Sequence, residues 1–114
     1  MGAITTHILD VSSGSQARGV SVLLWQQLEN SAWKIIGKGV TDEDGRLGDL
    51  LDPDAILQTG NYRLTFETGT YFAELQIEGF YPRVTIEFTV RDATQHYHVP
   101  LLLSPFGYST YRGS

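Results

Sequence analysis

The sequence contains no cysteine, and this absence excludes several classes of protein at once. Disulfide-stapled folds, zinc sites with thiolate ligands and enzymes with a cysteine nucleophile all require that residue. Basic residues are also scarce, because 8 Lys and Arg stand against 13 Asp and Glu, for a net charge of −5. This acidic balance argues against nucleic acid or an anionic membrane as the main partner, since both are bound by a concentrated basic patch.

The chain also lacks a long apolar run, a linker and an internal repeat. No segment approaches the roughly 20 apolar residues that span a membrane. The first seven residues lack the charged-then-apolar order of a signal peptide. We therefore expect a single domain over residues 1–114, in the cytosol or a similar reducing compartment.

Alternation of apolar and polar residues is the main signal that is present. In residues 61–67 and 84–91 every second side chain is apolar, which is typical of a strand with one buried face. Residues 20–28 behave similarly, with Leu28 placed on the buried face. Weaker patterns predict further strands over residues 4–10, 33–40 and 95–103.

Turn-forming residues separate these segments. Clusters of Ser, Gly, Asp and Pro occur at residues 12–15, 42–45, 51–54 and 91–94. A helix is predicted only over residues 71–76, where Phe72 and Leu75 lie on one side after Gly69. Short strands with regular turns and one helical segment predict an all-β fold, an antiparallel β-sandwich of two sheets.

All three histidines fall within predicted strands. His96 and His98 are two residues apart and therefore project from the same face of their strand. The opposite face carries the more apolar residues Tyr97, Val99, Leu101 and Leu103. We expect His98 to point away from the core, and His7 likewise, since its neighbours Ile4 and Ile8 suit the buried face better.

Outward histidines are usually just solvated polar residues, and three functional interpretations compete with that one. A His-x-His pair with a third histidine could hold a metal ion. Histidines with an arginine could instead hydrolyse an acyl bond, one activating water and another donating a proton. An outward groove could also bind an apolar ligand without chemistry. Composition and spacing do not separate these three.

Two further segments are candidates for a site. Arg46 follows the turn at residues 42–45 and is expected at the start of a strand, where most arginines are simple surface charges. Residues 109–114 read as a frayed tail, yet they could return as a final edge strand after the turn near Pro105. In that case Tyr111 and Gly113 would share a face.

Several motifs, taken together and in order, resemble one enzyme family. They are TTHILD at residues 5–10, DGR at 44–46, FYP at 80–82, QHYHVPLLLSP at 95–105 and YSTYRGS at 108–114. The chain resembles the 5-hydroxyisourate hydrolases, the transthyretin-like enzymes of urate degradation. The likeness extends over essentially the whole chain, and the terminal YRGS makes the set highly specific.

The resemblance implies a transthyretin-like sandwich of two four-stranded sheets with one short helix. It also implies a homotetramer, a dimer of dimers, with active sites in a central channel, no metal and no cofactor. The catalytic residues would be His7, Arg46 and His98. The substrate would be bound by His7, Arg46, Tyr111, Arg112, Gly113 and Ser114. His96 would either support the catalytic residues without contacting the substrate or have a structural role. The compartment implied is the cytoplasm, or the peroxisome in a eukaryote, or the periplasm if a leader was removed.

The reaction implied is hydrolysis of 5-hydroxyisourate to 2-oxo-4-hydroxy-4-carboxy-5-ureidoimidazoline. Either His7 or His98 would take a proton from water during attack on a ring carbonyl, and the other would polarise the substrate or protonate the leaving nitrogen. Arg46 would stabilise the developing anion. The alternative is a transthyretin-like carrier of small hydrophobic ligands, although transthyretin lacks the two histidines, the arginine and the terminal YRGS.

Overall fold

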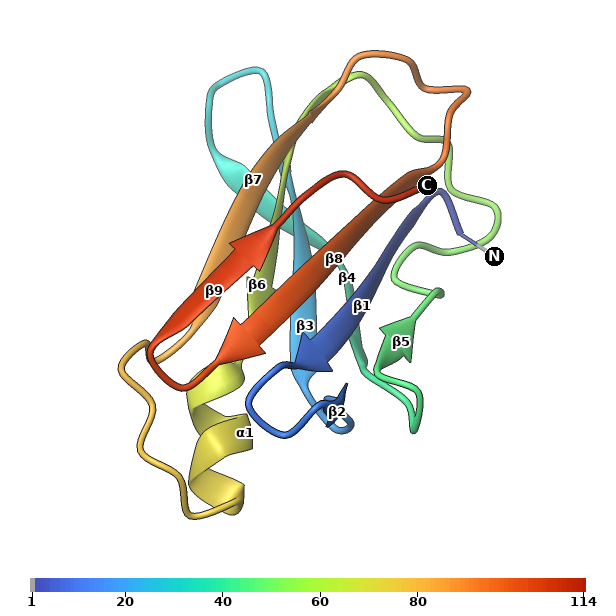
Figure 1. The fold of residues 1–114 in the computed structure, drawn as a ribbon. Helices are drawn as coiled ribbons and strands as arrows, with labels where there is room; N and C mark the ends of the chain where they lie inside the picture. The colour runs from blue at the N-terminus through green and yellow to red at the C-terminus, as the bar shows by residue number, and fades with distance from the viewer. Residues whose placement is uncertain (1) are drawn as a thin grey trace.

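The computed structural model describes residues 2–114, so Met1, which belongs to the predicted domain, lies outside the described residues. The described chain forms short strands and one helix (Figure 1). In chain order these elements are β1 (Ile4–Asp10), β2 (Ser15–Gln16), β3 (Ser21–Gln27), β4 (Trp33–Val40), β5 (Arg46–Leu47), β6 (Gly60–Phe66), α1 (Thr68–Glu74), β7 (Val84–Val90), β8 (Tyr97–Ser104) and β9 (Gly107–Thr110).

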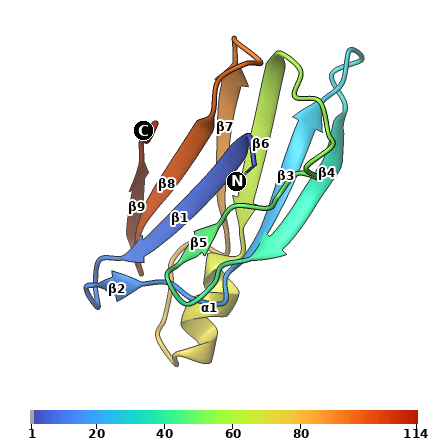
Figure 2. The same ribbon diagram turned by 90° about the vertical axis from the view of Figure 1, so that its right-hand side faces the viewer.

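The strands form two sheets that lie face to face (Figure 2). One sheet has four antiparallel strands in the order β4-β3-β6-β7. The other has the order β2-β1-β8-β9, and β5 also pairs with β1. The predicted all-β sandwich is confirmed. The second sheet differs from the expected four strands because β2 and β5 are two-residue strands, too short to show alternation.

One strand pair departs from the antiparallel pattern. β1 and β8 run parallel, with Thr5 beside His98 and His7 beside Pro100. Parallel neighbours need a long connection rather than a hairpin. Here all four strands of the β4-β3-β6-β7 sheet intervene in sequence between β1 and β8. The pairing brings the two predicted histidine strands together at the centre of one sheet.

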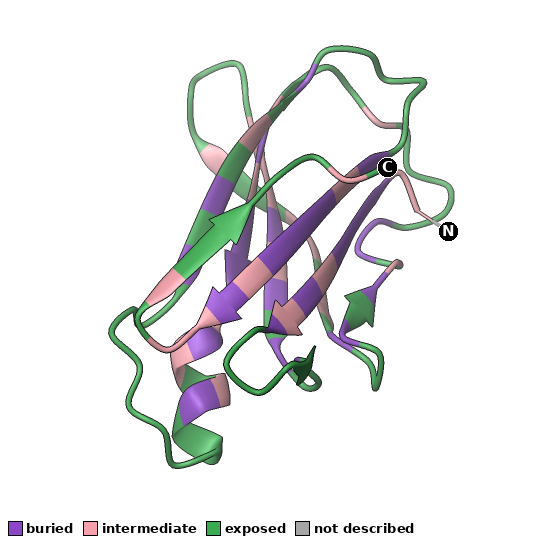
Figure 3. Ribbon diagram, in the orientation of Figure 1, coloured by how far each residue is buried: buried purple, intermediate pink, exposed green. Residues whose placement is uncertain are grey.

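The core lies between the sheets, and buried positions alternate most clearly along β7 (Figure 3). In β6 the residues predicted to be buried, Tyr62, Leu64 and Phe66, are at most 1% exposed. Leu28 is a wrong prediction, because it is 39% exposed. β3 ends before it at Gln27, and a register shift after Leu24 interrupts the alternation.

The helix is displaced from its predicted position at residues 71–76. It covers Thr68–Glu74 and buries Phe72, whereas Leu75 follows the last turn and is 50% exposed. Gln76 has φ 59°, in the left-handed region, and this conformation ends the helix. Within the described residues no helix is long and apolar enough to cross a membrane.

Candidate active site

The outer face of the β1–β8 pair carries the predicted histidines. In β8, Tyr97, Val99 and Leu101 are at most 6% exposed and point into the core, so the intervening His98 points outward. His7 also lies opposite the buried face of β1. The two imidazole rings lie nearly parallel, at an angle of 22°, with their centroids 6.5 Å apart. The alternation rule thus predicted both orientations, but the parallel pairing that joins them was not readable from the sequence.

Arg46 is brought to this face by a tight turn. The Asp42 carboxylate accepts hydrogen bonds from the backbone N–H groups of Asp44 and Arg46, at 2.9 and 3.0 Å. Gly45 has φ +71°, and a Cβ there would lie 2.6 Å from the Ile8 carbonyl oxygen, so only glycine allows this close approach. The result is that Arg46 begins β5, as predicted, directly beside His7 of β1.

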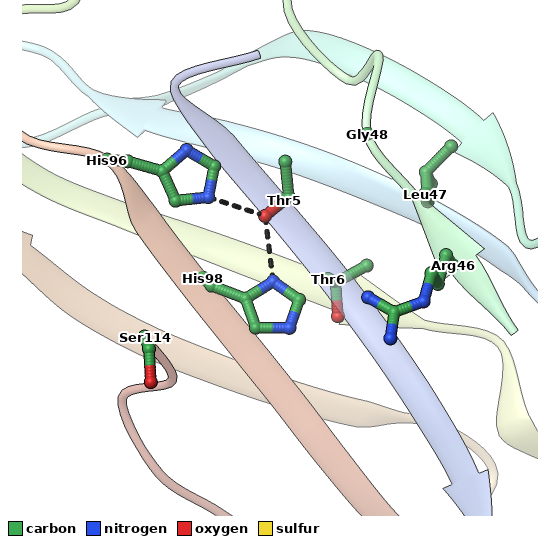
Figure 4. A pocket seen from close by; sticks show the side chains of 8 residues that line it. All are labelled: Thr5, Thr6, Arg46, Leu47, Gly48, His96, His98 and Ser114. Atoms are coloured by element: carbon green, nitrogen blue, oxygen red, sulfur yellow. Dashed lines mark hydrogen bonds between the residues drawn. The ribbon is translucent and has the colours of Figure 1, made fainter. Parts of the chain in front are cut away.

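Arg46 and His98 border an open cavity of about 170 Å³ (Figure 4), and His7 is not among its lining residues. It is lined by Thr5, Thr6, Arg46, Leu47, Gly48, His96, His98 and Ser114. No carboxylate is paired with Arg46 in the part of the chain that the structure describes. An unpaired guanidinium is a suitable group for an anionic, planar ligand, because its donors form a rigid fork.

Thr5 is a site residue that sequence reasoning missed. Its hydroxyl lies 2.7 Å from His98 Nδ1 and 3.0 Å from His96 Nε2, so it bridges the two imidazoles (Figure 4). Alternation along β1 puts Thr5, two residues before His7, on the same face as His7, and this is the signal that the sequence offers. Its contact with His98 depends on the β1–β8 register, and no local pattern encodes that register.

The environment favours the neutral forms of both principal histidines, His7 and His98. Burial lowers the pKa of His98 below 6.5, and the charges of neighbouring His7 and His96 lower it further. Burial also lowers the pKa of His7, with Arg46 as the next cause, while the nearby Asp42 and Asp44 oppose this shift. Neutral imidazole has a basic nitrogen, so each ring is able to accept a proton at neutral pH.

His7 also has an unused polar atom. Its Nε2 is buried and makes no hydrogen bond within residues 2–114. A buried polar atom without a partner costs free energy, so such atoms normally have a water or a ligand as partner. This nitrogen therefore needs a partner that residues 2–114 of one chain do not supply.

The C-terminal residues approach the site unequally. The backbone N–H of Gly113 donates to the His98 carbonyl at 2.8 Å, and Ser114 reaches the cavity. Arg112 turns away, because its guanidinium lies 4.4 Å from the centre of the Tyr97 ring. Tyr111 is 58% exposed and borders a second hollow near β7, which Arg112 and His98 also line. Within one chain Ser114 thus lines the first cavity, whereas Tyr111 and Arg112 share only the second hollow with His98.

A metal centre has little support in this geometry. Among residues 2–114 no group of three or more His, Cys, Asp or Glu side chains is arranged to hold an ion. His96 and His98 both direct a ring nitrogen to the Thr5 hydroxyl instead. The arrangement favours proton transfer and anion binding over metal ligation.

Comparison with known proteins finds relatives of two kinds, 5-hydroxyisourate hydrolases and transthyretins. A probable 5-hydroxyisourate hydrolase of Caenorhabditis elegans is 51% identical over 98% of this chain and 82% of its own length. A 5-hydroxyisourate hydrolase of Salmonella typhimurium is 45% identical over 97% of this chain and 80% of its own.

Solved structures of both kinds of protein are similar to this chain. The 5-hydroxyisourate hydrolase of Klebsiella pneumoniae has a TM-score of 0.85 and 38% identity, covering 100% of this chain and 94% of its own. Sea bream transthyretin in complex with thyroxine has a TM-score of 0.91 and 29% identity, covering 97% and 94%. A family model described as HIUase/Transthyretin matches residues 4–113, nearly the whole chain. With relatives about half identical over almost its full length, the chain belongs to the HIUase/Transthyretin family.

Proposed function

We propose that this protein hydrolyses 5-hydroxyisourate to 2-oxo-4-hydroxy-4-carboxy-5-ureidoimidazoline, a step of urate degradation. The names of relatives at 43–51% identity support this activity. The fold does not separate an enzyme from a carrier, because a transthyretin shares it as well. The choice must therefore come from the chemistry of the site.

The observation that carries the proposal is the combination of His7, His98 and Arg46. Two outward imidazoles with lowered pKa values lie 6.5 Å apart beside an arginine without a carboxylate partner. A carrier of apolar ligands has no use for buried basic nitrogens, which would cost free energy to desolvate. A hydrolase that activates water needs such groups.

The reaction divides between the two imidazoles. One neutral ring takes a proton from water as the water oxygen attacks the amide carbonyl carbon of the six-membered ring. The C–N bond then breaks, the leaving nitrogen receives a proton and the carbonyl carbon becomes a carboxylate. General acid–base help of this kind typically raises rates by about 10²–10⁴. The second imidazole polarises the substrate or supplies the proton to the leaving nitrogen.

Arg46 stabilises the charge that develops during attack. Its guanidinium is always protonated and can donate two parallel hydrogen bonds to a planar anion. Figure 4 shows it on the same side of the cavity as the second ring nitrogen of His98. A donor placed beside the attacked carbonyl stabilises the oxyanion more than the ground state, and this difference lowers the barrier.

The cavity of one chain is small for a complete site. Ligand pockets usually have volumes of about 300–1,000 Å³, compared with about 170 Å³ here. We infer that a second copy encloses the site in a homotetramer, a dimer of dimers, whose tails Tyr111 to Ser114 help to form a central channel. Neither a metal nor a cofactor takes part.

The test is the decay of freshly made 5-hydroxyisourate, followed by ultraviolet absorbance with and without the protein. We expect the protein to accelerate this decay well above the spontaneous rate, and His98→Ala at equal concentration to serve as the matched control. Decay at the spontaneous rate, together with binding of thyroxine, would favour the carrier.

A further inference from the structure

The hydroxyl of Thr5 lies between two imidazoles at hydrogen-bond distance from both. It is 2.7 Å from His98 Nδ1 and 3.0 Å from His96 Nε2 (Figure 4). Thr5 is only 4% exposed, so water has little access to this hydroxyl and the two ring nitrogens are its partners. The bridge therefore links two histidines that both line the cavity, His96, which is exposed, and His98, which is half-buried.

A hydroxyl group carries one proton and can donate only one hydrogen bond at a time. With two nitrogen partners, Thr5 can donate to only one ring, so at least one of the two rings must donate an N–H to the hydroxyl oxygen. If Thr5 donates to His96, then His98 carries its proton on Nδ1 and its Nε2 is unprotonated. If Thr5 donates to His98, then His98 Nδ1 is unprotonated and His98 Nε2 carries the proton. The tautomers of the two rings are thus coupled through one side chain.

Arg46 selects between these two states. Figure 4 shows the second ring nitrogen of His98, Nε2, on the side of the cavity where the Arg46 guanidinium lies. A guanidinium has donors and no acceptor, so an N–H directed toward it is repelled whereas a lone pair is attracted. The favoured state has the His98 proton on Nδ1, donated to Thr5, and the Thr5 proton donated to His96.

We propose that Thr5 is a positioning residue that holds His98 with an unprotonated Nε2 facing the substrate, and that His96 accepts the Thr5 proton. This inference rests on the proposed hydrolase function and adds to it the identity of the general base. His98 then takes the proton from water at Nε2. His7, whose own Nε2 has no partner within residues 2–114, is left to polarise the substrate or protonate the leaving nitrogen. His96 has a defined part in the site, as the acceptor that fixes the direction of the bridge.

The first test measures the tautomers directly, without substrate. Nitrogen-15 spectra of the imidazole rings, recorded at a pH where all three histidines are neutral, distinguish a proton on Nδ1 from one on Nε2. We expect His98 and His96 each to carry the proton on Nδ1 in the parent protein. In Thr5→Val, which keeps the shape of the side chain and removes the hydroxyl, His98 should shift toward the Nε2–H form that free imidazole favours. Thr5→Ser should retain the parent spectrum.

The second test is kinetic. Thr5→Val should lower kcat by about tenfold, the effect of losing one hydrogen bond that acts in the transition state, with KM nearly unchanged. Thr5→Ser should restore kcat, which a purely packing role of the methyl group would not allow. The melting temperatures of both variants show whether the fold is intact.

Two results would overturn the inference. They are a parent protein in which His98 carries its proton on Nε2, and a Thr5→Val variant whose His98 tautomer matches that of the parent. Absence of turnover in the parent protein would instead defeat the proposed hydrolase function. In that case the spectra would still decide whether Thr5 sets the tautomer of His98.

Discussion

The surroundings of His7 and His98 lower the pKa of each imidazole. Burial withdraws water from His7 and His98, and the positive Arg46 makes a second positive charge nearby unfavourable. Both effects favour the neutral imidazoles, which are the forms that can accept a proton. At the scale of single residues, the same Arg46 guanidinium that would bind an anion also helps to keep the two imidazoles unprotonated and able to act as bases.

Removing either imidazole should reduce activity without unfolding the protein. We expect His7→Ala or His98→Ala to lower turnover by about 10²–10⁴, since each removes general acid–base help. The melting temperature should change little, because both rings lie on the outer face of the sheet rather than in the core. Steady-state rates and thermal melts check this, and a His98→Ala variant as active as the parent would rule out the mechanism.

The pH dependence of activity should report the lowered pKa values. Since His7 and His98 must be neutral, activity should be retained at pH 6.5 and lost as the pH falls below it. The two rings interact, so the acid limb gives an apparent pKa of the pair. Arg46→Gln removes a charge that opposes protonation, and the acid limb should therefore move up toward 6.5.

Arg46→Lys is the matched variant for that experiment. Lysine keeps the positive charge, so the acid limb should stay below 6.5, but kcat/KM should fall because lysine has no planar fork of donors. Profiles of kcat/KM against pH for the parent and both variants separate the two effects. An acid limb that does not move in Arg46→Gln would show that Arg46 does not set these pKa values.

At the scale of elements, the long strands were predictable and the short ones were not. The alternation of apolar and polar residues in β6 and β7 is strong because each strand has one face toward the core and one toward solvent. The two-residue strands β2 and β5 exist only through pairing with β1, which is a tertiary contact. The helix was misplaced for a similar reason. It begins before Gly69, whose lack of a side chain permits close contact with Pro82, a contact that only the fold reveals.

The site was predictable in part. The outward orientation of His98 follows from alternation, and Arg46 follows from the turn that precedes it. The role of Thr5 and the direction of Arg112 depend on the β1–β8 register and on packing over Tyr97. The Thr5–His98 bond joins residues about 90 positions apart in sequence, and the Arg112–Tyr97 contact joins the C-terminal tail to β8. Local sequence patterns carry no information about them.

The tail segment after β9 lies against His98, and the absence of a side chain at Gly113 permits this close contact. A Cβ at Gly113 would lie 2.6 Å from His98 Cδ2 and 3.2 Å from Pro100 Cγ. We expect Gly113→Ala to displace the imidazole or lift the tail, and to lower turnover by about 10²-fold, as misplacement of a catalytic group by an ångström can do. Rates and the nitrogen-15 spectrum of His98 measure both effects.

Gly107→Ala, at the start of the strand β9 that leads into this tail, provides the control. A Cβ at that position would meet only Ser104 Oγ, at an ordinary contact distance of 3.7 Å. The control should therefore keep parent activity and stability. Equal loss of activity in both variants would mean that any added methyl group in the tail is harmful, and the specific contact with His98 would lose its support.

At the scale of the whole molecule, one chain leaves much apolar surface uncovered. Phe80 and Phe106 are 67% and 64% exposed, and Tyr111 is 58% exposed. Large exposed apolar side chains often mark a surface that another chain covers. The small cavity beside His98 and this uncovered surface both agree with the proposed tetramer. Neither fold nor oligomer identifies the ligand, since a transthyretin with thyroxine has the same fold.

Additions at the end of this chain should therefore be harmful, although chain ends usually tolerate them. Ser114 lines the cavity with His96 and His98, and Gly113 is bonded to the His98 backbone, so residues added after Ser114 must pass through the site or a subunit interface. We expect an extension after Ser114, and equally a deletion of residues 111–114, to lower turnover strongly. An extension of equal length before Met1 controls for the added chain and should have little effect. Turnover and sedimentation of the three proteins are the measurements, and a fully active tetramer carrying the extension after Ser114 would show that the tail lies outside the channel.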